Sequence, residues 1–328
     1  MSARPQADLS IEQALALASR AIVSAPRVVL ACHVNPDGDA LGSMLALHHV
    51  LRAAGIESVA SFPNPFVVAP HYRDLPGLEL LTAPDLVESE PPVLVTFDSG
   101  SLSRLGDLET RAKAAAELIV VDHHASNERY GTINVIDERA AASGVLVRRL
   151  IEELRLPLTR DAAVCLYAAL VCDTGRFQYE STTSDVFDLA RELACFDLPI
   201  ASLSRVLFEE HRFAYLKLAA AVLGRAELVP EKNFVWAKVT QEDLAEHDVT
   251  FEEIEGLIDL VRRTREADVA CVLKEASDGA WRVSLRSLGA VDVCKIAEHE
   301  GGGGHRFAAG FTSDDPAEVV IQRILAAL

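Results

Sequence analysis

Long apolar runs and basic residues are both scarce in this sequence of 328 residues. No run reaches the roughly 18 to 20 apolar residues that a membrane-spanning helix needs, and residues 1–8 lack the apolar stretch of a signal peptide. We therefore expect a cytoplasmic protein without a membrane partner. Lysine and arginine number 31 against 49 aspartate and glutamate, a net charge of 31 − 49 = −18, so long duplex nucleic acid is not an expected partner either.

Internal repeats, low-complexity tracts and C-x-x-C pairs are absent as well. Without the cysteine spacing of zinc or redox sites, we interpret the six cysteines as reduced and mostly buried: Cys32, Cys165, Cys172, Cys195, Cys271 and Cys294. The rest is an ordinary globular composition, 50% apolar and 24% charged, in a chain long enough for roughly two domains.

Short apolar runs alternate with helical stretches in the first half of the chain. A helix is expected over residues 10–24, apolar runs follow at 27–32, 58–62, 93–97 and 118–121, and helical spacing separates them at 41–54 and 103–116. Continuous apolar strands that alternate with helices are typical of a parallel sheet covered on both faces. We therefore predict a doubly wound, mainly parallel α/β domain that binds its ligands beyond the carboxyl ends of the strands.

The second half of the chain predicts a smaller α/β domain. A helix at 161–171 comes first, and a long helical segment at 202–223 would connect the two domains. Strands follow at 234–239, 268–275 and 281–287, with helices at 241–263 and 291–299, a glycine run, and a last helix from Pro316. The predicted bounds are 1–195 for the first domain, 196–225 for the connector and 226–328 for the second domain, with the active-site cleft between the two domains.

Polar residues that can bind metal follow three of the four apolar runs, and another ends the helix at 161–171. They are His33 with Asp37 and Asp39, then Asp98, then Asp122 with His123 and His124, and finally Asp173. Each has a structural alternative, because an aspartate can cap a helix and Asp-Ser-Gly is an ordinary turn sequence. Capping explains one aspartate of the first group but neither the second nor the histidine. His48 and His49, on a helix that looks exposed, are interpreted as structural.

These groups would bring four or five carboxylates and two or three imidazoles to one edge of the sheet. So many acidic groups would repel one another unless cations neutralised them, which favours a two-metal centre. Aspartate and histidine without cysteine suit manganese or magnesium better than structural zinc. Paired ions of this kind support hydrolytic phosphoryl chemistry.

A glycine run near the end of the chain, residues 301–304, is followed by His305. It does not fit G-x-G-x-x-G, no G-K-[ST] follows, and His299-Glu300 lacks the second histidine of a zincin. A flexible linker is one interpretation. The other is a substrate loop, because the amides of consecutive glycines can surround a phosphate.

Together the ordered motifs resemble those of the DHH phosphoesterase family, and Gly301-Gly302-Gly303-Gly304-His305 is similar to the signature of its DHH-associated C-terminal domain. The resemblance covers nearly the whole chain and is strongest to the NrnA-type branch. That branch degrades very short oligoribonucleotides (nanoRNA) to mononucleotides and often removes the 3′-phosphate of adenosine 3′,5′-bisphosphate (pAp). It implies an enzyme with two divalent ions, manganese first, with magnesium or cobalt as alternatives.

The resemblance also assigns roles to residues of this sequence. One ion would be held by His33, Asp37 and Asp98, and the other by Asp39, Asp98, His123 and Asp173. Asp122 and His124 would be catalytic residues: Asp122 would orient the centre and His124 would face the scissile phosphate. The substrate would be bound by Arg286, Ser287, Gly302, Gly303, Gly304 and His305.

Other functions stay open at this stage. The main alternative is hydrolysis of linear or cyclic dinucleotides such as pApA or cyclic di-AMP, and a weaker one is a catalytically silent nucleotide sensor. A RecJ-type exonuclease is disfavoured by chain length and acidity, and a family II pyrophosphatase by the lack of a lysine-rich C-terminal signature. Preferred oligomer length and polarity, and whether the protein is a homodimer, are not predicted.

Overall fold

The computed structural model describes residues 9–328, and the chain divides into two compact units. The N-terminal unit runs to Val68 and continues from Tyr72 to Leu207, and the C-terminal unit comprises Ala69–His71 and Phe208–Leu328. Within residues 9–328 no helix combines the length and the apolar character needed to cross a membrane. All six cysteines are free, and Cys32, Cys165 and Cys271 are buried.

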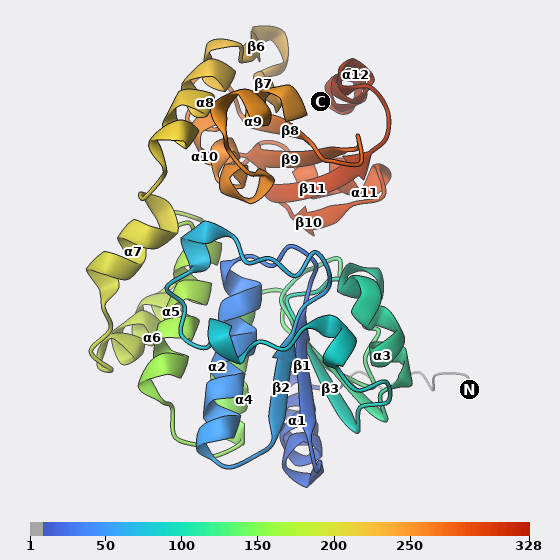
Figure 1. Ribbon diagram of the computed structural model, residues 1–328, viewed down its shortest axis with the longest axis vertical. Helices are drawn as coiled ribbons and strands as arrows, with labels where there is room; N and C mark the ends of the chain where they lie inside the picture. The colour runs from blue at the N-terminus through green and yellow to red at the C-terminus, as the bar shows by residue number, and fades with distance from the viewer. Residues whose placement is uncertain (1–8) are drawn as a thin grey trace. The chain divides into compact units, whose positions relative to one another are not determined.

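A fully parallel five-stranded sheet forms the centre of the N-terminal unit (Figure 1). Its order is β2-β1-β3-β4-β5. The strands are β1 (Val28–Cys32), β2 (Ser58–Ser61), β3 (Val93–Phe97), β4 (Glu117–Asp122) and β5 (Ile133–Ile136). The four predicted strands are confirmed. The fifth, β5, is a short edge strand whose four residues alternate between buried and half-buried, too weak a pattern to stand out in the sequence.

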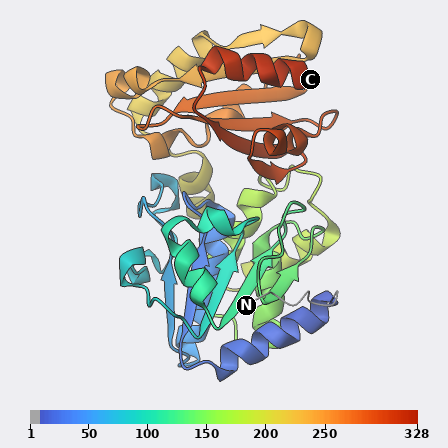
Figure 2. The same cartoon turned by 90° about the vertical axis from the view of Figure 1, so that its right-hand side faces the viewer.

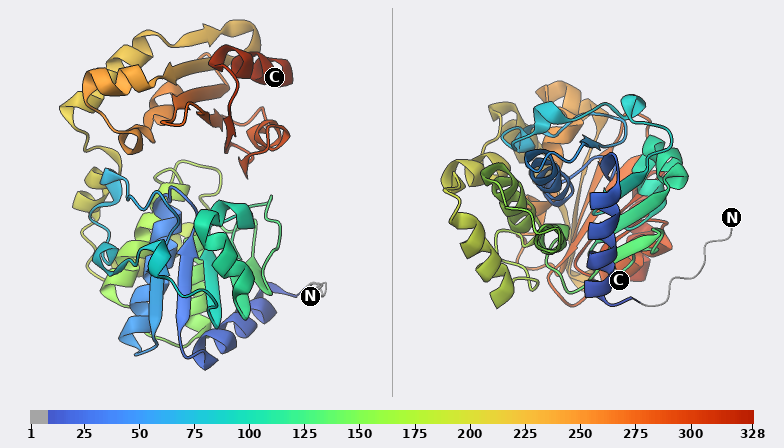
Figure 3. Two further views of the ribbon diagram at one scale, coloured as in Figure 1. Left: turned by 45° about the vertical axis from the view of Figure 1, so that its right-hand side comes forward. Right: turned by 90° about the horizontal axis from the view of Figure 1, so that it is seen from below.

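Helices cover both faces of this sheet, as predicted (Figure 3, right). On one face lie α2 (Gly38–Ala53) and α4 (Ser143–Glu153), and α5 (Arg160–Asp173) packs against α2 as a further layer. On the other face, alternate strand residues such as Val29 and Leu94 pack on the 3-10 segment η4 (Leu102–Leu108) and on α3 (Glu109–Ala114). The single helix predicted at 103–116 is thus a 3-10 segment followed directly by a short α-helix, and the non-helical conformation of Gly106 kinks the 3-10 segment.

The remaining helices of this unit are α1 (Ile11–Ser24), α6 (Ser184–Ala194) and α7 (Ile200–Phe208). Helix α1 packs on β5 and α4. The expectation that His48 and His49 lie on an exposed helix face is wrong. His48 is only 1% exposed on α2, where its Nδ1 lies 2.9 Å from the Ser58 hydroxyl, and burial lowers its pKa to about 4. His49 is half-buried, with Nε2 2.9 Å from the Pro76 carbonyl. Both histidines are therefore structural.

The helical segment predicted at 202–223 is also two helices, α7 and α8 (Phe213–Gly224). The break falls at residues 209–212, four exposed polar residues with no apolar side chain to continue a buried stripe. Arg212 instead binds the carbonyl and carboxylate oxygens of Asp248.

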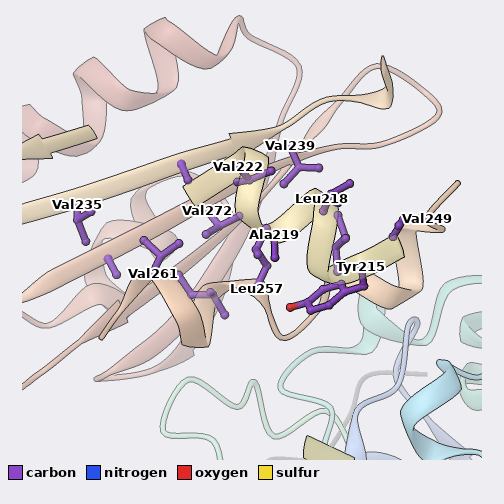
Figure 4. Packing of buried hydrophobic residues seen from close by; sticks show 14 of the residues in the cluster. Tyr215, Leu218, Ala219, Val222, Val235, Val239, Val249, Leu257, Val261 and Val272 are labelled. Atoms are coloured by element: carbon purple, nitrogen blue, oxygen red, sulfur yellow. The ribbon is translucent and has the colours of Figure 1, made fainter. Parts of the chain in front are cut away.

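The C-terminal unit is built on a mixed six-stranded sheet of order β10-β11-β9-β8-β7-β6, in which only β7 and β8 are parallel. The strands are β6 (Glu227–Val229), β7 (Phe234–Val239), β8 (Val269–Glu275), β9 (Trp281–Ser287), β10 (Gly303–His305) and β11 (Ala308–Ser313). Helix α8, with α9 (Gln241–His247) and α10 (Leu257–Val261), packs on one face around Val235 and Val272 (Figure 4). Helices α11 (Val293–His299) and α12 (Ala317–Ala327) pack on the other face (Figure 2).

Candidate metal centre

Strand register brings the predicted ligands of the N-terminal unit to one edge of its sheet. Cys32 at the end of β1 pairs with Phe97 at the end of β3, and Phe97 pairs with Val121 of β4. The next residue of each strand is therefore His33, Asp98 or Asp122. Because parallel strands share their carboxyl edge, the three side chains arrive at one place without help from the helices.

His33 and Asp37 form the first cluster with Asp98. Nε2 of His33 lies 3.8 Å from Asp37 Oδ2 and 3.5 Å from Asp98 Oδ2. The other oxygen of Asp37 caps α2 by accepting the amides of Asp39 and Ala40. Capping and the predicted ligand role are thus compatible, since each uses a different carboxylate oxygen.

Asp39, His123 and Asp173 form the second cluster. Nε2 of His123 lies 3.0 Å from Asp173 Oδ2, 3.4 Å from Asp98 Oδ1 and 3.6 Å from Asp39 Oδ2. Asp39 comes from the first turn of α2 and Asp173 from the last residue of α5, so the packing of these two helices completes the cluster.

The two histidines present the same nitrogen to their clusters for the same reason. Nδ1 of His33 lies 2.8 Å from the carbonyl of Val34, and Nδ1 of His123 lies 2.9 Å from the carbonyl of Ala140. A carbonyl can only accept, so Nδ1 carries a proton and Nε2 is the atom that a cation would bind. Backbone carbonyls commonly orient metal-binding histidines in this way.

Asp98 stands between the clusters and is 3% exposed. Its Oδ2 faces His33 and its Oδ1 faces His123. The residue has a positive φ of 54°, which ends β3 abruptly and turns the side chain into the centre.

Asp122 holds His124 in place. Its Oδ1 accepts the amides of His123 and His124 and lies 2.7 Å from Nδ1 of the His124 ring. Its Oδ2 accepts a short hydrogen bond from the side-chain amide of Asn127, which also donates to the Ser99 carbonyl. Asp122 is completely buried, and its contacts are those of a residue that orients neighbours.

The sequence did not single out Asn127, or the three other groups that contact the candidate ligands: Ser43, Ser143 and Gly144. These are ordinary residue types, and no spacing in the sequence connects residue 39 with residue 143. Only the packing of α4 against α2 brings Ser143 and Gly144 to Asp39, whereas Ser43 follows Asp39 by four residues on α2, a spacing that places both on one helix face.

The pKa values of His33 and Asp39 are shifted so that both groups hold protons, which neutralise part of the negative charge of the centre. Burial and the charge of Arg104 lower the pKa of His33, but Asp37 and Asp98 outweigh them and raise it to about 9. Burial and the charge of Asp98 raise the pKa of Asp39 well above its usual range. The burial of Asp98 would raise its pKa too, yet the neighbouring histidines hold it well below the usual range. Divalent ions would displace these protons.

The donor set fits divalent cations. In each of two groups, His33/Asp37/Asp98 and Asp39/His123/Asp173, the ligand atoms lie within 4.8 Å of one another. Carboxylate oxygens with one imidazole suit manganese or magnesium, and no cysteine sulfur takes part in either group.

The predicted substrate residues of the C-terminal unit lie on β9 and on or just before β10, the two strands that flank β11. His305 of β10 pairs with Ala308 of β11, which pairs with Arg286 of β9, so His305 and Arg286 belong to one row across the sheet. Arg286 donates from Nη1 to the Leu285 carbonyl, and its buried Nε has no hydrogen-bond partner among the described residues. The hydroxyl of Ser287 is buried and bonded to Asp268 and the amide of Gly289.

The glycine run is not a loop throughout, in contrast to what the sequence suggested. Gly303 and Gly304 belong to the edge strand β10 with His305, while Gly301 and Gly302 precede it. A Cβ at Gly302 would lie 2.2 Å from the Gly310 oxygen, and one at Gly304 would lie 2.5 Å from the Ala308 oxygen. The glycines therefore let β10 approach β11 closely, a contact that strand propensities could not reveal because glycine is rare in strands.

Two family comparisons agree with this geometry. Residues 27–170 match the DHH family, N-terminal domain, and residues 231–328 match the DHHA1 domain. A Thermus thermophilus protein named bifunctional oligoribonuclease and PAP phosphatase NrnA is 33% identical over 290 residues, which cover 87% of this chain and 83% of that protein. The chain belongs to the DHH family.

Two further proteins match this chain over most of its length. A Bacillus subtilis protein with the same name is 28% identical over 286 residues, covering 86% of this chain and 88% of its own length. The crystal structure of an exopolyphosphatase-related protein from Bacteroides fragilis has the same fold, with a TM-score of 0.86, 23% identity and coverage of 96% of this chain and 95% of that one.

Proposed function

We propose that this DHH family protein is a two-metal phosphoesterase that hydrolyses short oligoribonucleotides to mononucleotides and removes the 3′-phosphate of pAp. The observation that carries the proposal is the pair of histidine–carboxylate clusters that share Asp98. The names of the relatives from Thermus thermophilus and Bacillus subtilis support the choice of substrates.

In this proposal one ion would be held by His33, Asp37 and Asp98, and the other by Asp39, Asp98, His123 and Asp173. When bound, two such ions supply Lewis acidity to the phosphate and lower the pKa of a coordinated water. We propose manganese as the resident metal, with magnesium or cobalt as substitutes, because oxygen and imidazole ligands suit these ions.

The ring of His124 acts on the substrate. Asp122 fixes its Nδ1 side at 2.7 Å, so Nε2 is the atom assigned to the scissile phosphate. Burial lowers the pKa of His124, but the charges of Asp98 and Asp122 raise it overall. A protonated His124 stabilises negative charge on the phosphate and can donate a proton to the leaving oxygen.

Arg286, His305 and the glycines 302–304 bind a second phosphate of the substrate. For Ser287 we replace the predicted substrate contact by a supporting role at the end of β9, because its hydroxyl is already bonded to Asp268 and the Gly289 amide. The buried Nε of Arg286, which has no hydrogen-bond partner within residues 9–328, supports this assignment, because arginine binds phosphate with parallel N–H donors. The net charge of −18 favours short nucleotides over long duplexes. The six free cysteines support a location in the reducing cytoplasm.

A product-resolved assay tests the proposed function. Manganese-loaded protein is incubated with end-labelled RNAs of two to five nucleotides, with pAp and with cyclic di-AMP, and Asp98→Ala protein serves as the control for contaminating nuclease. We expect mononucleotides from the RNAs and AMP from pAp. Cleavage of cyclic di-AMP alone would replace the proposal by the dinucleotide alternative, and no cleavage of any substrate would leave a nucleotide sensor.

A further inference from the structure

The first turn of α4 touches two candidate ligands from different strands and helices. Ser143 is the first residue of this helix and is 0% exposed. Its amide donates to Asp39 Oδ2 at 2.5 Å, and its hydroxyl donates to Asp98 Oδ1 at 3.0 Å. The next amide, of Gly144, donates to Asp39 Oδ1 at 2.9 Å. One short segment thus binds a carboxylate of the second cluster and the carboxylate shared by both.

Three hydrogen bonds from the described residues to Asp39 leave one lone pair of its carboxylate for a cation. Oδ1 accepts from Gly144 and from the hydroxyl of Ser43 at 2.9 Å, which occupies both of its lone pairs. Oδ2 accepts from Ser143 alone among the described residues and keeps one lone pair. Oδ2 is also the oxygen that faces Nε2 of His123. The hydrogen bonds therefore select one oxygen of Asp39 for the second cluster.

The hydroxyl of Ser143 orients the carboxylate of Asp98 in a similar way. It engages Oδ1, the oxygen on the side of His123, and so fixes the rotation of a carboxylate whose Oδ2 must face His33. A free rotation about the last side-chain bond of Asp98 would point both oxygens away from their clusters.

Helix α4 also favours the ionised form of Asp39, the form that a divalent cation would bind. The N-terminal end of this eleven-residue helix, where the helix dipole is positive, lies against Asp39. Its first two amides, which lack a partner within the helix, donate to the Asp39 carboxylate. Asp39 and Asp98 are both buried, and their negative charges repel each other. Hydrogen-bond donors that favour the ionised carboxylates therefore lower the free-energy cost of keeping both ionised for cation binding.

We propose that Ser143 is a positioning residue that sets Asp39 and Asp98 for the binding of two ions, the amide acting on Asp39 and the hydroxyl on Asp98. The inference rests on the proposed two-metal function. It assigns to Ser143 no contact with substrate.

A matched pair of variants tests it. Ser143→Ala removes the hydroxyl from the shared carboxylate Asp98 and keeps the amide on Asp39. Ser43→Ala removes a hydroxyl of the same burial from Asp39 alone. Metal-free proteins are titrated with manganese by calorimetry, and bound metal is counted by elemental analysis. Loss of a group that orients a ligand costs about ten- to a hundredfold in metal affinity. We expect such a loss for both ions in Ser143→Ala and for one ion in Ser43→Ala.

Activity supplies a second readout. In Ser143→Ala the manganese concentration for half-maximal turnover should rise about tenfold or more, while the KM for pAp at saturating manganese stays at the wild-type value. Thermal unfolding in EDTA verifies that the variant is folded, and Ser143→Gly, which keeps the same amide, replaces it if it is not. Wild-type affinity for both ions in the folded variant, or a changed KM with unchanged metal affinity, would overturn the inference.

The metal titration separates this inference from the proposed function. If wild-type protein binds two manganese ions but cleaves none of the nucleotides, the substrate assignment fails while the Ser143 result keeps its meaning. If wild-type protein binds no divalent ion, both fail.

Discussion

Asp98 contacts the two clusters through different oxygens, and no neighbouring carboxylate faces both histidines in the same way. We expect Asp98→Ala to lose both bound ions and to reduce turnover to background, because each cluster loses a charged ligand and the remaining ligands are fixed by their own hydrogen bonds. Elemental analysis and the pAp assay measure the two effects. Retention of two ions with wild-type turnover would contradict the shared position of Asp98.

Asp122→Asn is the matched control, since Asp122 is equally buried but faces His124 and Asn127. This variant should keep both ions and lower kcat by roughly 10²- to 10⁴-fold, the usual contribution of a positioned acid or base. Loss of metal in Asp122→Asn would show that Asp122 is itself a ligand.

The role proposed for Arg286 predicts that its removal lowers kcat/KM only for substrates with a second phosphate. Arg286→Ala should lower kcat/KM for pAp by about ten- to a hundredfold, equivalent to a charge-assisted hydrogen bond of about 1.5 to 3 kcal/mol, and leave bis(p-nitrophenyl) phosphate nearly unaffected. Arg282→Ala is the control, because Arg282 lies on the same strand but pairs with Asp278 at 3.1 Å. Equal losses on both substrates would remove the recognition role from Arg286.

Individual residues could be predicted from the sequence where a strand delivers them. His33, Asp98 and Asp122 each follow a run of buried apolar residues, so the end of the strand fixes their place. Ser143 and Asn127 could not be predicted, because their importance comes from hydrogen bonds. Ser143 bonds to a residue 104 positions earlier, through the packing of helices that carry no distinctive spacing.

Among the elements, the contact between α2 and α5 is the one that completes the second cluster. At Gly42 the two helices are so close that a Cβ would lie 2.4 Å from the Cys165 carbonyl oxygen. We expect Gly42→Ala to destabilise the N-terminal unit by about 1 to 3 kcal/mol, the usual cost of overpacking, and to weaken manganese binding by displacing Asp173 relative to Asp39.

Gly256→Ala is the control for this change, because a Cβ there meets no atom within 4 Å. Urea unfolding is followed by circular dichroism and by tryptophan fluorescence, which reports on the C-terminal unit because both tryptophans, Trp236 and Trp281, lie there. An unchanged midpoint in both signals for Gly42→Ala would mean that the helices separate at little cost.

Elements with buried continuous runs were predicted well, and those that depend on neighbours were not. β1, β3 and β4 were recognised from apolar composition, while β10 was missed because glycine carries no strand signal. Its strand conformation comes from pairing with β11. The break between α7 and α8 was missed for a related reason, since polar residues are common on exposed helices and do not by themselves end one.

For the molecule as a whole, the protons held by the centre couple stability to pH. The folded pKa of His33 is raised from 6.5 to about 9, so in the metal-free protein this histidine stabilises the fold fully below pH 6.5 and progressively less as pH rises toward about 9. The raised pKa of Asp39 acts in the same direction, because its ionisation adds repulsion near Asp98.

Manganese should reverse this trend, because the ions bind neutral histidine and ionised carboxylate and therefore bind better as pH rises. Melting temperatures in EDTA and in excess manganese, compared between pH 6.5 and about 9, should diverge as pH increases. A constant difference between the two series would contradict the protonated state assigned to the metal-free centre.

The order of residues along the chain has a consequence for biosynthesis. Every candidate ligand lies between His33 and Asp173, within the N-terminal unit that ends at Leu207, whereas Arg286 and His305 come much later. A ribosome therefore completes the metal-binding part of the protein before it has made the residues assigned to nucleotide recognition. A divalent ion held by these ligands would therefore act on the folding of the first unit while the second is still being translated.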